Sequence, residues 1–495
     1  MKKIAFMLVT ICLILLHTIP IAAQEESAVQ EEIIYNILVD RYNNGNADND
    51  DQVQIDDPKA YHGGDLEGVI SKLDQLQEIG ITTISLSPIM ENAPDGYHGY
   101  WIEDFYNVEE QFGTMEDLHT LIEEAHERNI KVVMEFVTNY VVSSHSLLND
   151  SETEDWAEES NDLNVDWADN VAVLNQNNPE VEDFLLDAAS FWMDETDIDG
   201  FKLHAVDQAS ESFLQHFTAQ LKEKDEDFYL LGDILHTDER VSDLKENTDI
   251  DLIENQDLYE TMTDVFSEEG KPVLDVVETW EESGGDSDIL YVDNMYTERF
   301  TQKFTENGRN ALTTWTLALT YMYTTPGVPS LFQGSEIPVY GVDAEASQRL
   351  VNFNSGNDEI KEFLSQLSSL RTEFPVLSHG DFEHVGSSGG MTVFKRTYGD
   401  ESIYIAINND TELQSVTVSD IESGMQLRGH LGDNIVRENK DGEYKIGLER
   451  EVAEVFVVEP DTGFNWAFIG VFGGIFLLFV GGIIYLTRKQ KKRSA

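Results

Sequence analysis

Residues 199–206 constrain the fold of this chain more than any other segment. They read DGFKLHAV, an apolar run in which His204 stands where a strand would end. Around this run, from Ile33 to about Leu377, strand-like and helix-like segments alternate, which indicates repeated βα units. Eight such units close into a (β/α)8 barrel, the TIM barrel, whose functional residues lie at the C-terminal ends of the strands. The sequence therefore predicts an α/β fold with His204 at the functional end of a barrel.

Seven segments, in order along the chain, resemble the strand motifs of the α-amylase family (glycoside hydrolase family 13). They are IIYNILVDRY at 33–42, ITTISLSP at 81–88 with GYHGYW at 96–101, VVMEFVTN at 132–139, DGFKLHAV at 199–206, LLGD at 230–233, YVDN at 291–294, and PGVP at 326–329 with GSE at 334–336. Both the order and the spacing resemble those of the family, over about residues 33–459. The resemblance implies a role in carbohydrate metabolism and supports the predicted barrel.

The same resemblance predicts how the chain divides into domains. The barrel is expected at residues 24–378, with a small inserted B domain at about 141–175, where a polar and acidic stretch follows the third strand motif. Short alternating apolar runs between 379 and 459 predict an antiparallel β-sandwich domain at the C-terminal side of the barrel.

The three catalytic carboxylates of the family align with His204, Asp233 and Tyr296 of this chain. Retaining glycosidases need two carboxylates about 5 Å apart, a nucleophile and an acid/base. Here the nucleophile position holds an imidazole, the acid/base position holds a carboxylate one methylene shorter than Glu, and the third position holds a phenol. The family pattern also implies substrate contacts at His98, Tyr100, Asn139 and Lys202, where Lys202 replaces the family's Arg.

Neighbouring positions depart from the family as well, because Glu135, Tyr140, Gln208 and Met295 replace an Asp and three His residues. Several interpretations stay open. His204 is either a hydrogen-bonded polar residue at the barrel mouth or a group with a new role. Tyr296 and Met295 fill an emptied sugar subsite, and Tyr100 either packs in the core or stacks on a sugar. Asp207 is a further candidate for the lost nucleophile.

A calcium site is predicted in the loop after the first strand motif. The segment NGNADND at 44–50 is followed by GGD at 63–65, and Asn, Asp and backbone carbonyl oxygens are the ligands that calcium prefers. The spacing is similar to that of cyclodextrin glucanotransferase-like family members. By that resemblance the ligands are Asn44, Asn46, Asn49, Asp50, Gly63 and Asp65. An ordinary Asn/Asp/Gly turn is the alternative.

Both ends of the chain indicate a position at a membrane. Residues 1–23 are typical of a secretory signal peptide. The apolar run at 464–486 exceeds the roughly 20 residues that a membrane-spanning helix needs, and a basic tail follows at 487–495. Positive charge beside a span stays in the cytoplasm. The sequence therefore predicts a single-pass protein of the cell membrane with its globular part outside.

The formal net charge of −64 is extreme for 495 residues. Acidity of this kind suits an organism living at high salt, where screening shortens charge repulsion, and it argues against nucleic acid as a partner. The one cysteine, Cys12, lies in the predicted signal peptide, so the mature chain has no disulfide.

Three hypotheses for function follow. The first is an α-amylase homologue at the cell surface that has lost hydrolysis, a pseudoenzyme that binds an α-glucan, an oligosaccharide or a protein partner. The second is an active α-glucan hydrolase or transglycosidase with rearranged catalytic residues, Asp233 serving as acid and Asp207 or Glu135 as its partner. The third is an ancillary subunit of a membrane complex, with a membrane protein as partner.

Overall fold

The computed structural model describes residues 28–50, 52–149, 153, 155–158, 165, 167–236, 240–283, 285, 288–356, 358–461, 463 and 466–493. The predicted signal peptide lies outside these residues.

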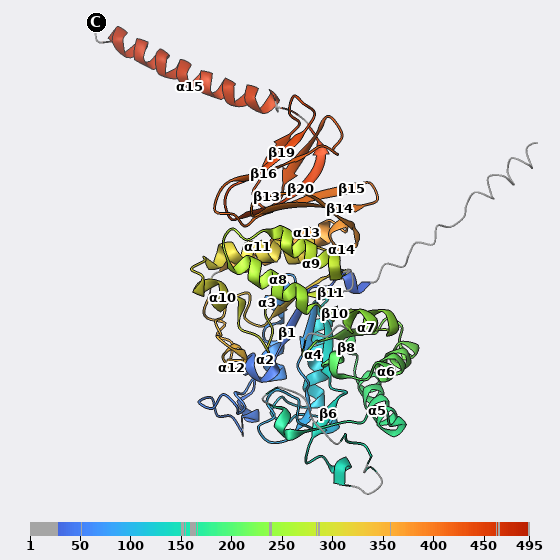
Figure 1. Ribbon diagram of the computed structural model, residues 1–495. Coiled ribbons are helices and arrows are strands. Elements are labelled where there is room, and N and C mark those ends of the chain that lie inside the picture. The colour runs from blue at the N-terminus through green and yellow to red at the C-terminus, as the bar shows by residue number, and fades with distance from the viewer. Residues whose placement is uncertain are drawn as a thin grey trace, which may run out of the picture.

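A closed barrel of eight parallel strands forms the centre of the molecule (Figure 1), as predicted. In chain order its strands are β1 (Ile34–Ile37), β2 (Thr83–Leu86), β5 (Lys131–Phe136), β8 (Gly200–Leu203), β9 (Tyr229–Gly232), β10 (Leu252–Glu254), β11 (Asp288–Leu290) and β12 (Val328–Phe332). Each pairs with its sequence neighbours and β12 closes the ring onto β1. These strands are short and almost wholly buried, which is why they read as apolar runs and not as alternating patterns.

Helices cover the outside of the barrel. They are α2 (Leu66–Ile70), α3 (Leu73–Glu78), α4 (Met115–Glu127), α5 (Pro179–Glu195), α6 (Glu211–Lys224), α7 (Val241–Asn247), α8 (Gln256–Ser267), α9 (Val273–Ser283), α10 (Phe300–Glu306), α11 (Ala311–Thr324), α12 (Ala344–Ser347), α13 (Asp358–Glu373) and α14 (Val376–His379). Several of these helices begin at capping residues in the local sequence. Thr114 and Asp117 form a capping box on α4, and Asn178 caps α5 with a proline in its first turn.

Two small excursions leave the barrel at its C-terminal end. The first contains the hairpin of β3 (Met90–Asn92) and β4 (Ile102–Val108). The second follows β5, where the inserted domain was expected, and contains the antiparallel pair of β6 (Tyr140–Val142) and β7 (Val171–Val173). These excursions carry aromatic side chains over the barrel mouth.

An antiparallel domain follows the barrel, again as predicted. Six strands pair in the order β13 (Asp381–Ser388), β14 (Met391–Tyr398), β15 (Glu401–Asn408), β20 (Val452–Pro460), β17 (Met425–Gly429) and β18 (Ile435–Arg437), and a second sheet pairs β16 (Gln414–Val418) with β19 (Tyr444–Leu448). Figure 1 shows this domain on the helical layer of α9, α11 and α14. The fully buried Arg396 ties the two together by donating hydrogen bonds to the carbonyls of Thr324, Leu377 and Gly380.

The last helix, α15 (Trp466–Arg493), projects away from the β domain (Figure 1) and includes the basic residues of the predicted tail. Across the part of the chain that the structure describes, no helix combines the length and the hydropathy needed to cross a membrane. The transmembrane helix predicted at 464–486 is therefore not found, and its first two residues fall outside the description. Between 470 and 484, large apolar side chains of α15 such as Leu478 (78% exposed) stand in solvent.

Candidate active site

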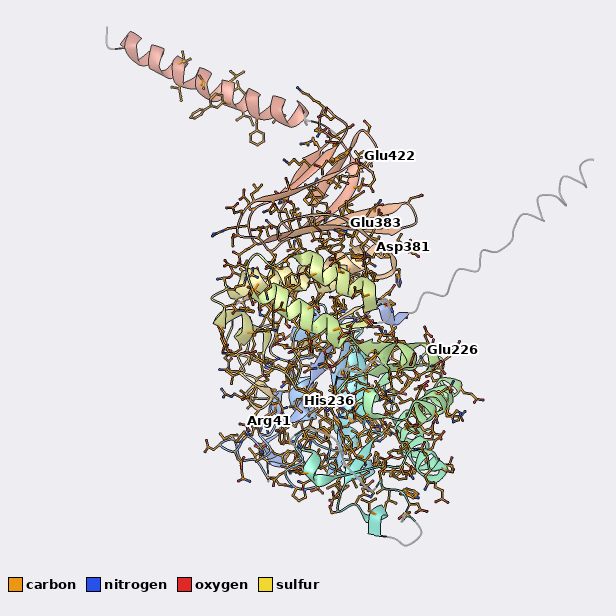
Figure 2. All side chains as sticks on the ribbon, viewed as in Figure 1. Arg41, Glu226, His236, Asp381, Glu383 and Glu422 are labelled. Carbon is orange, nitrogen blue, oxygen red and sulfur yellow. The ribbon has the colours of Figure 1, made fainter. Side chains whose placement is uncertain are left out.

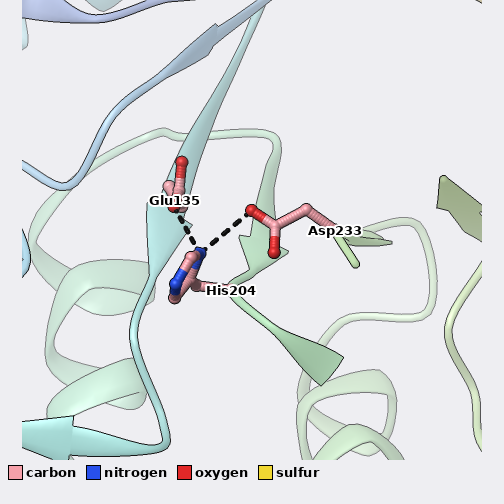
Figure 3. Close-up of side chains that lie close together, drawn as sticks. All are labelled: Glu135, His204 and Asp233. Carbon is pink, nitrogen blue, oxygen red and sulfur yellow. Dashed lines mark hydrogen bonds and ion pairs between the residues drawn. The ribbon is translucent and has the colours of Figure 1, made fainter. Parts of the chain in front are cut away.

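Three polar side chains meet inside the C-terminal end of the barrel. Glu135 lies on β5, while His204 and Asp233 are the residues that directly follow β8 and β9. The Nδ1 atom of His204 lies 3.0 Å from Glu135 Oε1 and 3.0 Å from Asp233 Oδ2 (Figure 3). His204 is fully buried, and its two partners are at most 3% exposed.

Barrel register explains why these side chains meet. The strand neighbours of β8 hold its end in place: the His204 amide donates to the carbonyl of Phe136, and the Asp233 amide donates to that of Leu203. The chain then turns at Ala205, whose φ of +50° is left-handed. The Ala205 amide donates to Asp233 Oδ1, and Asn139 Nδ2 bonds the carbonyls of His204 and Ala205, each at 2.9 Å. Asn139 thus supports the turn through its Nδ2 atom, while its Oδ1 atom accepts a hydrogen bond from the Gln176 side chain at 2.9 Å.

Charges hold the cluster together. Burial lowers the pKa of His204, but the facing carboxylates of Asp233 and Glu135 outweigh this and raise it to about 10. Burial likewise opposes the charge on Asp233, yet His204 and Lys202 lower the pKa of Asp233 below its ordinary value. Without a further bound group, His204 is therefore an imidazolium whose Nδ1–H faces two carboxylates at neutral pH. Its Nε2 atom has no hydrogen-bond partner among the described residues.

A lysine and a third carboxylate extend the cluster. Lys202 Nζ lies 3.7 Å from Asp233 Oδ2 and 3.5 Å from Glu254 Oε1 at the end of β10. Burial raises the pKa of Glu254 to about 7, although Lys202 acts against this. The second oxygen of Glu254 has no partner in the described part of the chain. A cavity of about 20 Å³ lies between Lys202, Glu254 and Tyr296, so little space remains in the mouth of the barrel.

Aromatic side chains cover the cluster. The ring of Tyr100 stacks on His204, with centroids 4.4 Å apart, and its hydroxyl donates to Glu135 Oε1 at 2.8 Å. The hydroxyls of Tyr100 and Tyr296 are hydrogen-bonded to each other, and Tyr296 OH lies 3.5 Å from His204 Nδ1. Tyr100 is fully buried, so in this structure it packs over His204 and leaves no face for a sugar ring.

A larger groove lies on the outer side of Tyr296. It has a volume of about 590 Å³ and is lined by aromatic and polar side chains. They include Tyr97, His98, Trp101, Trp167, Tyr296 and Gln348. Trp101 directly precedes β4. Its indole N–H donates a hydrogen bond to the carbonyl of Trp167, which lies in the excursion after β5. The groove is open and aromatic, whereas the cluster beneath it is closed and charged.

Comparison with known proteins decides the family. The profile described as "Alpha amylase, catalytic domain" matches residues 36–169 and 156–372, and "Alpha-amylase C-terminal domain" matches 380–456. This chain belongs to the α-amylase family. The crystal structure of an Anoxybacillus α-amylase is 40% identical, with a TM-score of 0.84, and the match covers 89% of this chain and 100% of that one. An α-amylase from Geobacillus thermoleovorans, solved with acarbose, is 39% identical over 88% of this chain and 99% of its own, with a TM-score of 0.81. A "Beta/alpha-amylase" of Paenibacillus polymyxa is 26% identical over 86% of this chain but only 38% of its own length.

Most of the residues predicted from the family motifs lie at the barrel mouth. His204, Asp233 and Tyr296, expected at the three catalytic positions, do lie together, as do Tyr100 and Lys202 of the predicted substrate contacts. His98 lines the groove and has its pKa lowered to about 3 by burial, so it is neutral. Asn139 lies behind the turn, away from the groove.

Asp207, the proposed substitute nucleophile, has another task in this family member. Its carboxylate accepts hydrogen bonds from the amides of Leu235 and His236, at 2.8 and 2.9 Å, and from the side chain of Gln208. It is fully buried and fixes the loop after β9. Asp207 is therefore a structural residue here, not a second carboxylate of the cluster.

Some of the residues predicted to bind calcium lie close together in the loop after β1. Asn44 Nδ2 lies 2.9 Å from Asp50 Oδ1, and a Cβ at Gly63 would lie within 2.9 Å of both side chains, so these three residues converge on one small space. Asp65 differs, because its carboxylate accepts from the amides of Gly45, Asn46 and Gly68 and caps α2. The side-chain oxygens of Asn44 and Asp50 are of the kind that calcium takes, while Asp65 shapes the loop that carries them.

Two parts of the site were missed from the sequence. Glu254 ends an apolar strand, which is the same signal that marked position 204, but no family motif drew attention to it. Trp167 lies in the irregular segment after β5, where neither periodicity nor spacing indicates which side chain returns to the barrel mouth.

Proposed function

We propose that this protein is a glycoside hydrolase of family 13 that acts on α-glucans, and that the glucan binds in the groove of Tyr97, Trp101 and Trp167. Aromatic faces suit the apolar faces of glucose rings, and the groove has room for several of them. The relatives support the substrate class, since the 39% identical α-amylase was solved with acarbose and cyclomaltodextrinases are among the related sequences.

Glu135 and Asp233 carry the proposed chemistry. One oxygen of each lies within 4.8 Å of the other and of His204 Nδ1, so the two carboxylates are at least as near to each other as the roughly 5 Å of retaining glycosidases requires. In this proposal Asp233 takes the acid/base position and Glu135 is the second carboxylate. Asp233 is ionised beside His204 and Lys202, so it has to accept a proton, for which the imidazolium of His204 is the nearest source, before it protonates the glycosidic oxygen. Because both are buried under Tyr100 and Tyr296, the tyrosines have to move aside before a sugar reaches them.

A second candidate function, α-glucan binding without hydrolysis, is favoured by one observation. His204 stands at the family's nucleophile position and holds both carboxylates by a single Nδ1 atom. An imidazolium there neutralises the carboxylates, and a misplacement of about 1 Å costs on the order of 100-fold in rate.

Reducing-sugar release from soluble starch and maltoheptaose separates the two functions. The assay uses residues 24–460 in molar salt with millimolar calcium. Turnover that disappears in both Asp233→Asn and Glu135→Gln supports hydrolysis by this pair. No turnover from a folded sample that still binds maltoheptaose supports binding alone. Neither turnover nor binding contradicts an α-glucan function.

We propose further that the protein resides at the cell membrane with its barrel outside. This rests on the signal-like residues 1–23, on the apolar side chains that α15 exposes, and on the basic residues at its end. A membrane protein that contacts α15 remains a possible partner under this proposal. Recovery of the full chain in the soluble fraction of lysed cells, without detergent, would contradict it.

A further inference from the structure

Glu135, His204 and Asp233 converge as the ligands of a metal ion do. The three donor atoms, one per residue, all lie within 4.8 Å of one another. They come from three adjacent strands of a closed barrel, so backbone hydrogen bonds fix their mutual positions. Figure 3 shows both carboxylates pointing at the same edge of the imidazole.

Distances within the cluster fit a small divalent ion. Zinc binds nitrogen and oxygen at about 2.0–2.2 Å, so neighbouring ligands in a tetrahedral site lie about 3.3 Å apart. The observed separations of 3.0 Å from Nδ1 to each carboxylate need to widen by only a few tenths of an ångström. Tyr296 OH, at 3.5 Å from Nδ1, lies at a similar distance and offers a fourth oxygen.

Buried charge supplies an independent argument. Glu135, Asp233 and Glu254 are each at most 4% exposed, and Lys202 is the one permanently cationic side chain that faces them in the described structure. In the metal-free cluster the imidazolium of His204 and the ammonium of Lys202 balance two of the three carboxylates. A divalent cation that takes the place of the imidazole proton balances all three together with Lys202, so metal binding leaves no unpaired buried charge. The unpartnered oxygen of Glu254, on the cavity shared with Glu135, is a further sign of an incomplete set of partners.

We propose that His204 Nδ1, Glu135 and Asp233 bind a first-row divalent transition metal, of which Zn²⁺ fits best. An imidazole nitrogen with two carboxylates suits zinc and disfavours calcium and magnesium, which take oxygen ligands. Zinc bound to Glu135 and Asp233 excludes the hydrolysis proposed for that pair, so this inference goes with the second candidate function, α-glucan binding without hydrolysis. The site is separate from the predicted calcium loop at residues 44–50. When zinc is bound, the imidazole is neutral and the metal carries the charge that the proton carries otherwise.

Metal analysis of the folded protein tests this directly. The protein is incubated with Zn²⁺, dialysed against metal-free buffer and analysed for bound zinc, and Co²⁺ is then used as a spectroscopic probe. We expect about one zinc per chain, a visible ligand-field band with Co²⁺, and a higher thermal midpoint with Zn²⁺. Each of the variants His204→Asn, Glu135→Gln and Asp233→Asn should lose all three signals.

Two control variants make the result specific. Tyr140→Phe alters a ring beside His204 without touching a donor, and Asp50→Asn alters the calcium loop. Both should keep the zinc. Absence of zinc, of the Co²⁺ band and of the thermal shift in the unmodified protein overturns the proposal without reference to any variant. Zinc that persists in all three donor variants also overturns it, because the ion then sits elsewhere.

Discussion

The groove and the cluster beneath it are two regions of one barrel mouth that differ in almost every physical property. The groove is open, about 590 Å³ in volume, and aromatic. The cluster is closed, with about 20 Å³ beside it, and charged. Tyr296 belongs to both, since it lines the groove and bonds Tyr100 above His204. The open aromatic groove, where we propose that the glucan binds, therefore lies beside a centre whose charged groups bond one another.

The residues that depart from the family pattern explain the difference. Relative to the α-amylase motifs, position 135 is lengthened from Asp to Glu and position 233 is shortened from Glu to Asp. Both carboxylates then reach Nδ1 of the imidazole at position 204 at the same distance. Each of these three departures removes a residue of the family pattern, yet the three side chains fit one another in the structure. This complementarity is what a structural or metal-binding role requires, whereas the groove needs no such matching.

The largest effect on stability is expected from a substitution that disrupts the cluster of Glu135, His204 and Asp233. Asp233→Ala leaves His204 and Lys202 without their shared partner in a buried site, and removal of one member of a buried ion pair costs about 3–5 kcal/mol. Urea denaturation measures the loss. The control is Glu226→Ala at the exposed edge of the molecule (Figure 2), where less than about 0.5 kcal/mol is expected. A loss below about 1 kcal/mol in Asp233→Ala would show that the cluster contributes little to stability.

The second effect is a pH dependence that originates in Glu254. Burial raises the pKa of Glu254 to about 7 from an ordinary value of 4.5, so between these values the folded state holds a proton that the unfolded state has lost. Stability in metal-free buffer should therefore fall as the pH rises from about 4.5 to 7, by roughly 2–3 kcal/mol. Glu254→Gln keeps the shape without the titration and should flatten this slope. An unchanged slope in the variant would assign the effect to other groups.

The fold was predictable from the sequence to a greater extent than the site. Buried parallel strands give apolar runs ending in a polar residue, and DGFKLHAV and LLGD are of this kind, so the barrel and the neighbourhood of His204 and Asp233 follow from pattern and family resemblance. The sequence offered Glu135 and Asp207 alike as partners of Asp233, and that Glu135 is the one that meets His204 Nδ1 depends on the register of β5 against β8, which the motifs do not specify. The hydrogen bonds of Asn139 to backbone carbonyls and of Asp207 to backbone amides likewise depend on loop conformation. These are long-range contacts, and a single sequence does not specify them.

The third effect concerns the predicted calcium loop, which lies outside both the groove and the cluster. Millimolar calcium should raise the thermal midpoint of the unmodified protein, since a ligand at 100 times its dissociation constant stabilises by about 2.7 kcal/mol. Asp50→Asn removes the negative charge and one carboxylate oxygen of a converging side chain and should abolish most of this rise. Differential scanning calorimetry with calcium and with a chelator measures it. An equal rise in the variant would place the responsible calcium elsewhere.

The smallest effect tests the groove alone. Trp101→Ala should weaken the binding of maltoheptaose about 10-fold, because a sugar stacked on an aromatic face gains on the order of 1 kcal/mol that a methyl group does not supply. Titration calorimetry measures this, and Tyr398→Ala, an exposed aromatic on β14 far from the groove, is the matched control. Asp233→Asn provides the contrast with the cluster, since it changes the buried charges and leaves the groove residues in place. If the groove and the cluster are separable, Trp101→Ala weakens binding, while Asp233→Asn loses stability and retains binding. Loss of binding in both variants would show instead that the glucan reaches past Tyr296 to the buried carboxylates, which is the arrangement that hydrolysis requires.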